Sequence, residues 1–387
     1  MTMAIKFYLT RDIKEISEND WNRLFGDLAE GYGYHKTLQE SGLKEFEFHY
    51  LIGRRDNNIV AVFPCFITDF SFTTLIQGPL QKIIFWMQSK FSRFLKFKLL
   101  FIGSPTTEEF YLGVDEKENL NEVVSGAFKK LSAFAKKEKI GLCLFYNLKK
   151  EHWILANTLK ANGFSPMEDY PNTVIRINAA SLEEYINGLS ANTRKDIKRK
   201  LKKSGELAKL TTEIKNEFKE DKKKIYSLYL NNFRGSEVQF EILTLDFFRN
   251  IFNNMPQNAK LFITRDNGKV VAFNLCIIKD DLCIDKFIGF DQELSRQYHL
   301  YYTTFCHNID WCIKNNIREY QMGITDYHPK LRLGAKLIPL VNYIRIFNPL
   351  MNFFVKPVLK IVEPKNFDPT LRKVLSKHYA GVVPTES

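Results

Sequence analysis

One sequence pattern, present once in each half of the chain, most limits how this chain can fold. Residues 55–65 read RDNNIVAVFPC and residues 265–276 read RDNGKVVAFNLC, so both place a polar turn before an apolar, β-branched run. Each turn also follows an apolar run, which is the pattern of a β-hairpin. The halves match again at residues 131–146 and 309–324, where a helical pattern precedes a strand pattern. Two matches in the same order indicate a duplicated domain, with chance similarity between hairpins as the alternative.

Length and composition agree with two globular domains. The chain has 387 residues, of which 45% are hydrophobic and 14% aromatic, so it can bury substantial apolar cores. The first residues, MTMAIKFYLTRDIKE, lack the apolar core of a secretory signal, and no window offers about 18 uncharged apolar residues. We therefore expect a cytoplasmic protein.

The cysteines predict neither a metal site nor disulfides. They are scattered among apolar neighbours, without a paired CxxC spacing and without nearby histidines, and this pattern is typical of buried thiols in a reducing compartment. The six are Cys65, Cys143, Cys276, Cys283, Cys306 and Cys312.

The charge predicts a polyanionic partner. Lys and Arg number 56 against 44 Asp and Glu, which gives a net charge of +12. Nucleic acid, an acidic membrane surface and a phosphate-rich cosubstrate all fit this excess. Part of it falls near residues 70–104, where the first half is longer than the second and a basic amphipathic insertion occurs. Such an insertion can lie on the inner face of an anionic membrane, or it can cap the domain with solvated lysines. Its basic residues are Lys82, Lys90, Arg93, Lys96 and Lys98.

Residues 282–339 combine a strand, a polar loop, an amphipathic helix, a second strand and a charged turn. Tyr302, Phe305 and Ile309 recur at helical spacing between two apolar runs of strand length. This order places the loop and the charged turn at the same strand-end side of a sheet, where α/β folds hold their chemistry.

The second strand, IREYQMGIT, and the turn, DYHPKLRLGA, resemble the second domain of tandem GNAT-type acyltransferases, of the branch related to Fem-type peptidoglycan aminoacyltransferases. The resemblance covers most of the chain. It implies an α/β (α+β) fold of two tandem GNAT-like domains, each a mixed, mostly antiparallel sheet flanked by helices. We expect an N-terminal domain over residues 1–180, a C-terminal catalytic domain over residues 181–362 and a polar tail over residues 363–387.

The resemblance also implies an enzyme. The expected activity is an N-acyltransferase or aminoacyltransferase that uses acyl-CoA or aminoacyl-tRNA as co-substrate, with no tightly bound cofactor and no metal. The acceptor would be an amine on a small molecule or a cell-envelope precursor. The alternative is a non-catalytic GNAT-like protein that binds an anionic glycan precursor, a membrane surface or RNA.

The charged turn supplies candidate catalytic residues. Tyr327 follows the strand after which many GNAT proteins place a proton-donating tyrosine, and Asp326 and Asp285 could accept a proton or hold an ammonium group. Lys330 and Arg332 in the same turn are candidate substrate contacts. The ordinary alternatives are that Asp326 caps a helix and that Asp285 belongs to a pair on the strand surface.

The loop at residues 291–299, DQELSRQYH, lies where GNAT enzymes have a glycine-containing pyrophosphate loop, yet it contains no glycine. The cofactor-binding candidates are Ser295, Arg296, Gln297 and Tyr298, with Arg296 supplying charge in place of close backbone approach. The missing glycine weakens the case for CoA and leaves aminoacyl-tRNA open.

Residues 190–205, SANTRKDIKRKLKKSG, predict a basic helix between the halves. Seven Lys or Arg and one Asp occur from Thr193 to Lys203, and like charges at this spacing repel by about a few tenths of a kcal/mol per pair. Because Fem-type enzymes have a matching region near their substrate groove, the resemblance makes Arg194, Lys195 and Lys198 candidate phosphate contacts. A solvated helix is the alternative, and without a compact three-helix unit nearby no DNA partner is expected.

Overall fold

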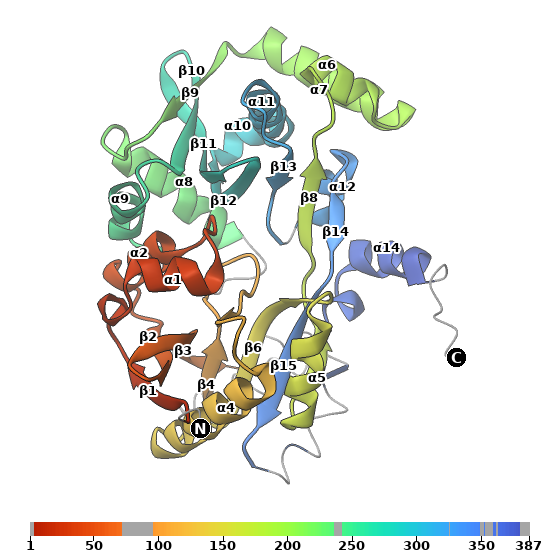
Figure 1. Ribbon diagram of the computed structural model, residues 1–387. Helices are drawn as coiled ribbons and strands as arrows, with labels where there is room; N and C mark the ends of the chain where they lie inside the picture. Colours follow the sequence, from red (N-terminus) through yellow and green to blue (C-terminus); the bar gives the residue numbers. More distant parts are fainter. Residues whose placement is uncertain are drawn as a thin grey trace, which may run out of the picture. The chain divides into compact units, whose positions relative to one another are not determined.

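The chain forms two compact units in the computed structural model (Figure 1). Unit 1 contains residues 1–27, 44–170 and 339–387, and unit 2 contains residues 28–43 and 171–338. The structure describes residues 4–71, 96–235, 242–324, 326–348, 352, 359–360 and 363–379.

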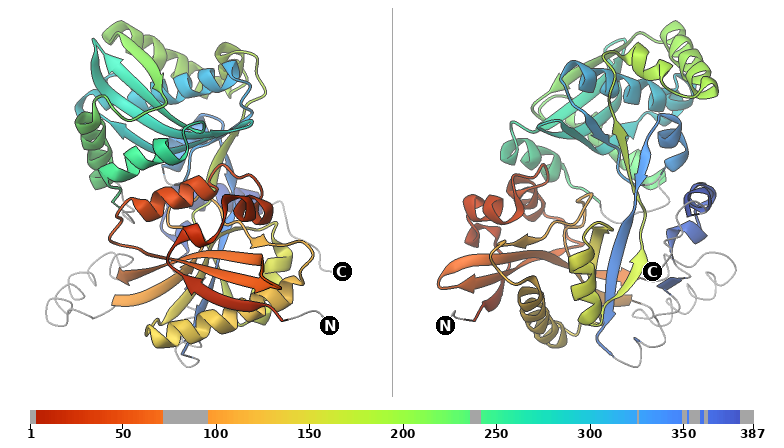
Figure 2. Two further views of the ribbon diagram at one scale, coloured as in Figure 1. Left: turned by 60° about the vertical axis from the view of Figure 1, so that its left-hand side comes forward. Right: turned by 45° about the vertical axis from the view of Figure 1, so that its right-hand side comes forward.

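Unit 1 is built on an eight-stranded sheet in the order β1-β2-β3-β4-β6-β15-β7, with β5 paired to β3. The strands are β1 (Lys6–Thr10), β2 (Glu47–Arg55), β3 (Asn58–Ser71), β4 (Lys96–Ile102), β5 (Gly113–Val114), β6 (Leu142–Lys149), β7 (Ser165–Glu168) and β15 (Leu340–Ile346). The helices are η1 (Ile13–Glu15), α1 (Glu18–Phe25), α4 (Leu120–Lys137), α5 (Trp153–Ala161), η3 (Pro364–Asn366) and α14 (Pro369–Tyr379). The α4 helix packs against this sheet, and its Val123, Ala127 and Leu131 belong to the buried core (Figure 2).

Unit 2 is built on a seven-stranded sheet in the order β9-β10-β11-β12-β13-β8-β14. Its strands are β8 (Asn172–Arg176), β9 (Leu210–Lys215), β10 (Ala259–Asp266), β11 (Lys269–Lys279), β12 (Leu282–Phe290), β13 (Glu319–Gln321) and β14 (Lys336–Ile338). Its helices are α2 (Tyr32–Glu40), α6 (Leu182–Asn187), α7 (Ala191–Leu207), α8 (Lys222–Gly235), α9 (Leu245–Asn254), α10 (Gln292–Gln297), α11 (Leu300–Lys314) and α12 (Tyr327–Arg332).

The two sheets repeat one strand order, which confirms the predicted tandem, mostly antiparallel fold. β4 pairs in parallel with β6, and β12 pairs in parallel with β13, while every other strand pair is antiparallel in the described residues. The repeat also involves an exchange of strands. The chain leaves β7 to form β8 in the second sheet, and it leaves β14 to form β15 in the first sheet.

The repeated hairpins form as predicted because both turns contain residues that tolerate a positive φ. Asp56 and Asn57 turn β2 into β3 with φ of 48° and 67°, and Asn267 and Gly268 turn β10 into β11 with φ of 48° and 80°. Positive φ at both central residues is the signature of a type I′ turn, whose twist matches that of the flanking strands.

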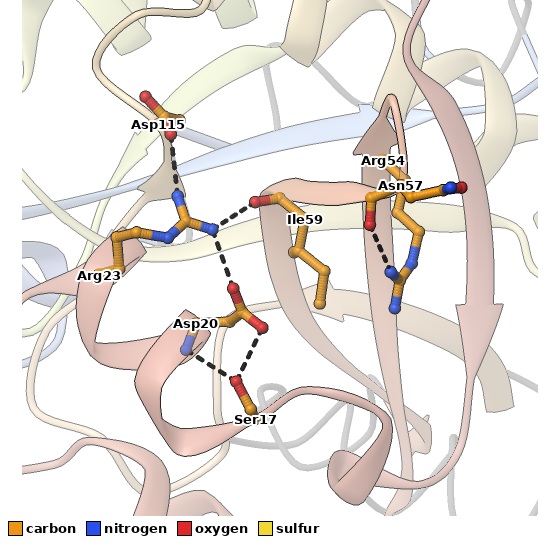
Figure 3. Close-up of polar contacts among 7 residues, drawn as sticks. All are labelled: Ser17, Asp20, Arg23, Arg54, Asn57, Ile59 and Asp115. Atoms are coloured by element: carbon orange, nitrogen blue, oxygen red, sulfur yellow. Dashed lines mark hydrogen bonds and ion pairs between the residues drawn. The ribbon is translucent and has the colours of Figure 1, made fainter.

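A polar cluster holds α1 against the first hairpin (Figure 3). The Ser17 hydroxyl caps α1 by accepting a hydrogen bond from the Asp20 amide. Arg23, one turn further on, donates to Asp115 at 2.9 Å and to the Ile59 carbonyl at 2.6 Å. One guanidinium therefore links α1 to β3 and to the residue that follows β5.

Units 1 and 2 do not meet at a single boundary, whereas the sequence predicts one domain boundary at residue 180. β15 lies in the sheet of unit 1, and α2 packs on α9 in unit 2, so neither unit is one continuous segment. The predicted basic insertion lies outside the described residues from 72 to 95. Its described ends are strand, since Ser71 pairs with Lys96. Likewise, the predicted polar tail contains η3 and α14, with Leu371 fully buried.

All six cysteines are buried free thiols, as predicted. Within the described ranges, no helix is long and apolar enough to cross a membrane, and no group of His, Cys, Asp or Glu could hold a metal ion.

Candidate functional site

The β12 and β13 strands separate in the middle of the second sheet and form a fork. They pair in parallel at Leu282, Cys283 and Ile284, and the last pair joins Ile284 to Gln321. β12 then continues to Phe290, while β13 ends. In unit 1 the equivalent pairing ends at Ile102, the last residue of β4, so that strand does not continue past its partner in the same way. The fork is therefore a feature of unit 2.

A bulge in β12 directly follows its last parallel pair with β13. Cys276 of β11 pairs with Asp285, and Leu275 pairs with Phe287, so β12 advances by two residues where β11 advances by one. Such a bulge redirects side chains and changes the direction of backbone groups, and bulges are common beside active sites.

Asp285 is the first β12 residue beyond the last parallel pair and the centre of a buried polar network. Its Oδ2 accepts hydrogen bonds from the Tyr320 hydroxyl at 2.6 Å and from Asn274 Nδ2 at 2.7 Å. Asn308 Nδ2 of α11 donates to the Tyr320 oxygen at 2.9 Å. All four side chains are buried, so Asp285 is not part of a strand-surface pair and that alternative is wrong. Burial raises the pKa of the Tyr320 phenol, and the charge of Asp285 raises it further.

Lys286, the next residue, leads to a second buried polar contact. Its ammonium lies 2.7 Å from Glu30, and the two side chains are 1% and 2% exposed. The ammonium also lies 5.5 Å from the centre of the Tyr34 ring in α2. The N-terminal part of the chain thus supplies a carboxylate to the bulge, a contact that no local sequence signal indicated.

Tyr301, in the first turn of α11, was not selected from the sequence. Its hydroxyl is shielded from solvent and has no hydrogen-bond partner among the described residues. Burial raises the pKa of the Tyr301 phenol, and the nearby charges of Asp326 and Asp285 raise it further. Its ring packs 4.5 Å from Phe305. In the sequence it looked like one more aromatic residue beside an apolar helix stripe.

The predicted residues of the charged turn lie in a tightly bonded part of unit 2. Tyr327 and Lys330 share α12, and both are buried. The Tyr327 hydroxyl donates to the Pro171 carbonyl at 3.0 Å. Lys330 Nζ donates to the carbonyls of Met322, Gly323 and Ile324 at 2.6, 3.2 and 3.0 Å. These bonds fix the loop that follows β13.

Asp326 is exposed and precedes α12 with a left-handed backbone, φ 46°. Its side chain makes no capping hydrogen bond to the helix, so the capping alternative is wrong. The catalytic roles of Asp326, Tyr327 and Asp285 remain predictions, as does substrate binding by Lys330.

The predicted cofactor loop contains the short helix α10. Asp291 caps it by accepting a hydrogen bond from the Leu294 amide, and Arg296 lies in its last turn. Of the candidates, Ser295 and Tyr298 are partly buried, whereas Arg296 and Gln297 are exposed. α11 then begins after His299, which has φ 51° and makes no side-chain cap. An N-terminus without a side-chain cap presents amide donors and a partial positive charge.

The basic helix α7 packs on α11 through the fully buried Ile197. Asp196 of this helix binds Arg199 at 2.8 Å, Lys200 at 2.8 Å and Arg332 at 2.9 Å. The hydrogen bond from Lys200 lowers the pKa of the Asp196 carboxyl to about 2, and Arg199 and Arg332 act in the same direction against the effect of burial. Arg332 thus bridges α12 and α7.

The α7 cations reach the start of α11. Lys200 Nζ lies 3.6 Å from the centre of the Tyr302 ring. Burial lowers the pKa of the His299 imidazole, and the charges of Lys203, Lys200 and Arg199 lower it further. His299 Nε2 is shielded from solvent without a partner in the described chain.

The three predicted α7 contacts divide into two kinds. Arg194 donates to the Asn187 carbonyl and Lys198 to Asn187 Oδ1, both at 2.9 Å, so these two hold the end of α6. Lys195 is exposed. Of the predicted substrate contacts, Arg332 therefore joins α7 through Asp196, and Lys330 shares α12 with Tyr327. Arg194 and Lys198 instead bond to Asn187 of α6.

A family model for FemAB-like proteins, described as peptidoglycan biosynthesis/recognition, matches residues 12–364. The chain belongs to the FemAB-like family. This confirms the Fem-related resemblance, and the match extends through both units.

Solved structures show the same fold at low sequence identity. FemX aligns with a TM-score of 0.56 at 12% identity, covering 92% of this chain and all of that chain. A tandem GNAT protein from the clavulanic acid biosynthesis pathway aligns with a TM-score of 0.54 at 11% identity, covering 89% and 99%. Both structures show the tandem fold that the sequence predicts.

Among curated proteins, a Mycobacterium tuberculosis protein that carries the name 8-amino-7-oxononanoate synthase 2 is 23% identical over 329 residues, in each of two strains. The match covers 81% of this chain and 42% of that protein. The chain thus spans less than half the length of these relatives.

Proposed function

We propose that this FemAB-like protein transfers an acyl or aminoacyl group from an activated donor to an amine, and that the reaction takes place at the β12–β13 fork of unit 2. The observation that carries the proposal is the fork itself, where β12 continues past its parallel partner and has a bulge beside the buried Asp285. A carbonyl held there would be next to strand amides, which can stabilise the oxyanion of acyl transfer.

The reaction needs two proton movements. The amine nitrogen attacks the carbonyl carbon, a C–N bond forms, and the C–S or C–O bond to the donor breaks. The amine loses one proton, and the leaving thiolate or alkoxide gains a second proton from a tyrosine hydroxyl, whose oxygen afterwards takes up the amine proton. We assign this second proton to Tyr301 in preference to Tyr327. The Tyr327 hydroxyl already donates to the Pro171 carbonyl, whereas the Tyr301 hydroxyl has no hydrogen-bond partner among the described residues.

Asp285 then acts as a positioning residue. It accepts hydrogen bonds from Tyr320 and Asn274, which tie β11, β12 and β13 together at the fork. Lys330 fixes the other side of the fork, the loop after β13, by donating hydrogen bonds to three of its carbonyls. Together these contacts hold β12 and the loop after β13 in place while substrates bind. A site that is held in position in this way speeds the reaction.

The donor phosphates would bind at the N-terminus of α11. That end has no side-chain cap, and the charges of the α7 residues Arg199, Lys200 and Lys203 act on His299, the residue that precedes the helix. A helix N-terminus with nearby cations is a favourable anion site. The pyrophosphate of an acyl-CoA or the backbone of an aminoacyl-tRNA supplies the anion, with Lys195 and Arg296 as outer contacts. No tightly bound cofactor is needed.

The acceptor would be a cell-envelope precursor or another small amine. The family description points to peptidoglycan, and a cytoplasmic protein touching the inner face of the membrane would meet such precursors. The test is a donor screen. The protein is incubated with acyl-CoAs and with charged tRNAs, in the presence of amino sugars and peptidoglycan precursors, and donor consumption is measured. Turnover of one donor class supports the proposal, and binding without turnover contradicts it.

A second candidate is a non-catalytic protein that recognises an anionic glycan precursor. The favouring observation is that Tyr327, predicted to be catalytic, and Lys330, predicted to contact the substrate, are both buried and bonded to backbone carbonyls. A protein of this kind would bind the precursor tightly and consume no donor.

A further inference from the structure

Unit 1 contains a cavity that the proposed reaction does not use. It has a volume of about 440 Å³, within the range of small-molecule sites. One face of α5 forms its wall, and two cross-strand pairs of β7 and β15 form its floor, Pro166 with Tyr343 and Glu168 with Val341. The residues on the α5 face follow helical spacing and are Trp153, Ala156, Asn157 and Lys160.

The charges around this α5 cavity leave an excess of cations. Glu168 and Glu363 both bind Lys365 at 2.8 Å. Lys149 binds the buried Glu109 at 2.5 Å, and Lys150 lies 3.6 Å from Glu168. The remaining lysines of the lining, Lys160 and Lys360, are exposed and form no ion pair with any described residue. The carboxylates are thus engaged, and two ammonium groups remain for an anion.

Trp153 adds an apolar surface to the same opening. It is 64% exposed, which is unusual for so large an apolar ring and leaves its face open to a ligand. Tyr343 lies on the floor, and Asn157 contributes an amide to the lining. The lining therefore combines two cations, an exposed ring and a neutral hydrogen-bonding group.

We infer that the α5 cavity is a binding site for a small phosphate ester that carries a ring, with Lys160 and Lys360 contacting the phosphate and Trp153 stacking on the ring. This site lies in unit 1 and does not depend on acyl transfer in unit 2. A phosphate ester of this kind occurs free in solution or as a lipid headgroup, and the two sources are separated by the test.

The test uses phenyl phosphate as the minimal probe, with inorganic phosphate and phenol as its two halves. Binding to the full chain is followed by ³¹P line broadening of the probe and by Trp fluorescence. A ligand of this size binds with a Kd in the millimolar range. The expected result is that phenyl phosphate binds at least about ten-fold more tightly than either half, because both contacts are made together.

Variants locate the site. Lys160→Gln with Lys360→Gln, and separately Trp153→Leu, should each weaken phenyl phosphate by about ten-fold at an unchanged melting temperature. The matched control is Lys129→Gln with Lys130→Gln, on the exposed side of α4, which removes the same charge and should leave the Kd unchanged. Equal weakening in the control, or no weakening in the cavity variants, would overturn the inference.

Vesicles distinguish the source of the phosphate. Phosphatidylcholine vesicles with and without phosphatidylinositol phosphate are added to the wild type and to the cavity variants. Vesicle binding that requires Trp153 and both lysines supports a lipid headgroup, and binding of phenyl phosphate alone supports a free ester. If neither probe binds in a way that depends on these three residues, the inference is wrong.

Discussion

The Tyr320 hydroxyl donates a 2.6 Å hydrogen bond to Asp285 Oδ2, and this bond joins β13 to β12 where the two strands separate. Asn274 and Asn308 extend it to β11 and α11. A buried carboxylate in such a network is stabilising only while its donors are in place, since an unpaired buried polar group costs about 1 to 3 kcal/mol.

Tyr320→Phe should therefore destabilise the protein by about 1 to 3 kcal/mol, because it leaves Asp285 and Asn308 each without one bond. Urea unfolding at pH 7 measures the change. The matched control is Tyr302→Phe, a ring that is partly exposed, and it should change stability by less than about 0.5 kcal/mol. Equal stability of the two variants would show that the network does not hold the fork together.

His35 should make stability depend on pH. Burial lowers the pKa of the His35 imidazole in α2 to about 3, from an ordinary value of 6.5. The unfolded chain therefore binds a proton below pH 6.5 that the folded chain does not, so stability falls as pH falls from 6.5 towards 3. His35→Gln should remove about 1 to 2 kcal/mol of the loss between pH 7 and pH 5.

Other histidines with lowered pKa contribute to the wild-type curve, so the measurement is the difference between wild type and variant. The exposed His328 provides the control, and His328→Gln should leave the pH dependence unchanged. An identical slope for wild type and His35→Gln would contradict a neutral, buried His35.

Cutting the chain at residue 180 should abolish independent folding of both halves. The first fragment would lose β15 from the middle of its sheet, and the second would lose β8, because each sheet takes one strand from the other half. Fragments 1–180 and 181–387 should each fail to melt cooperatively, and co-expression should restore one transition. Two fragments that separately melt near the full-length temperature would contradict the exchange.

A matched control keeps every strand. A protease site placed after Ala180 in the full chain, cut after folding, should leave the pieces associated with the melting temperature nearly unchanged. If the cut protein unfolds although every strand is present, the cut itself and not the missing strand explains why the separate fragments fail to fold.

Local patterns predicted the hairpins and the strand–helix–strand order because these depend on neighbours in sequence. Asp56-Asn57 and Asn267-Gly268 specify their turns directly. The exchange of β8 and β15 could not be read from the sequence, since either strand could pair with the sheet of its own half. The Glu30–Lys286 ion pair also escaped prediction, because its partners are 256 residues apart and each looks like an ordinary surface charge.

Local spacing also predicted part of the candidate site. Helical spacing placed Tyr327 and Lys330 on one face of α12. Spacing cannot show that this face is turned inward, towards Pro171 and the loop after β13. In contrast, Tyr301 became a candidate only through its burial and its neighbours.

Salt dependence should show whether α7 binds the donor. If Lys195 and Lys203 contact phosphates, Lys195→Gln with Lys203→Gln should weaken CoA or uncharged tRNA and flatten the plot of log affinity against log salt by roughly one to two units for tRNA. Both side chains are exposed, so the melting temperature should not change. Removal of two lysines from α4, Lys129 and Lys130, is the control, and an equal effect there would mean that the binding is unspecific.

Donor consumption by Tyr301→Phe, compared with Tyr327→Phe, tests the central claim most directly. Consumption is followed as released thiol for acyl-CoA or as lost ester for aminoacyl-tRNA. Proton transfer typically contributes about 100- to 10,000-fold in rate, so Tyr301→Phe should slow turnover by at least about 100-fold at an unchanged melting temperature. Tyr327→Phe should lower the melting temperature through its lost bond to Pro171 and slow turnover less. Near-normal turnover by Tyr301→Phe, with a loss of 100-fold or more by a stably folded Tyr327→Phe, would contradict this account and return the proton to Tyr327.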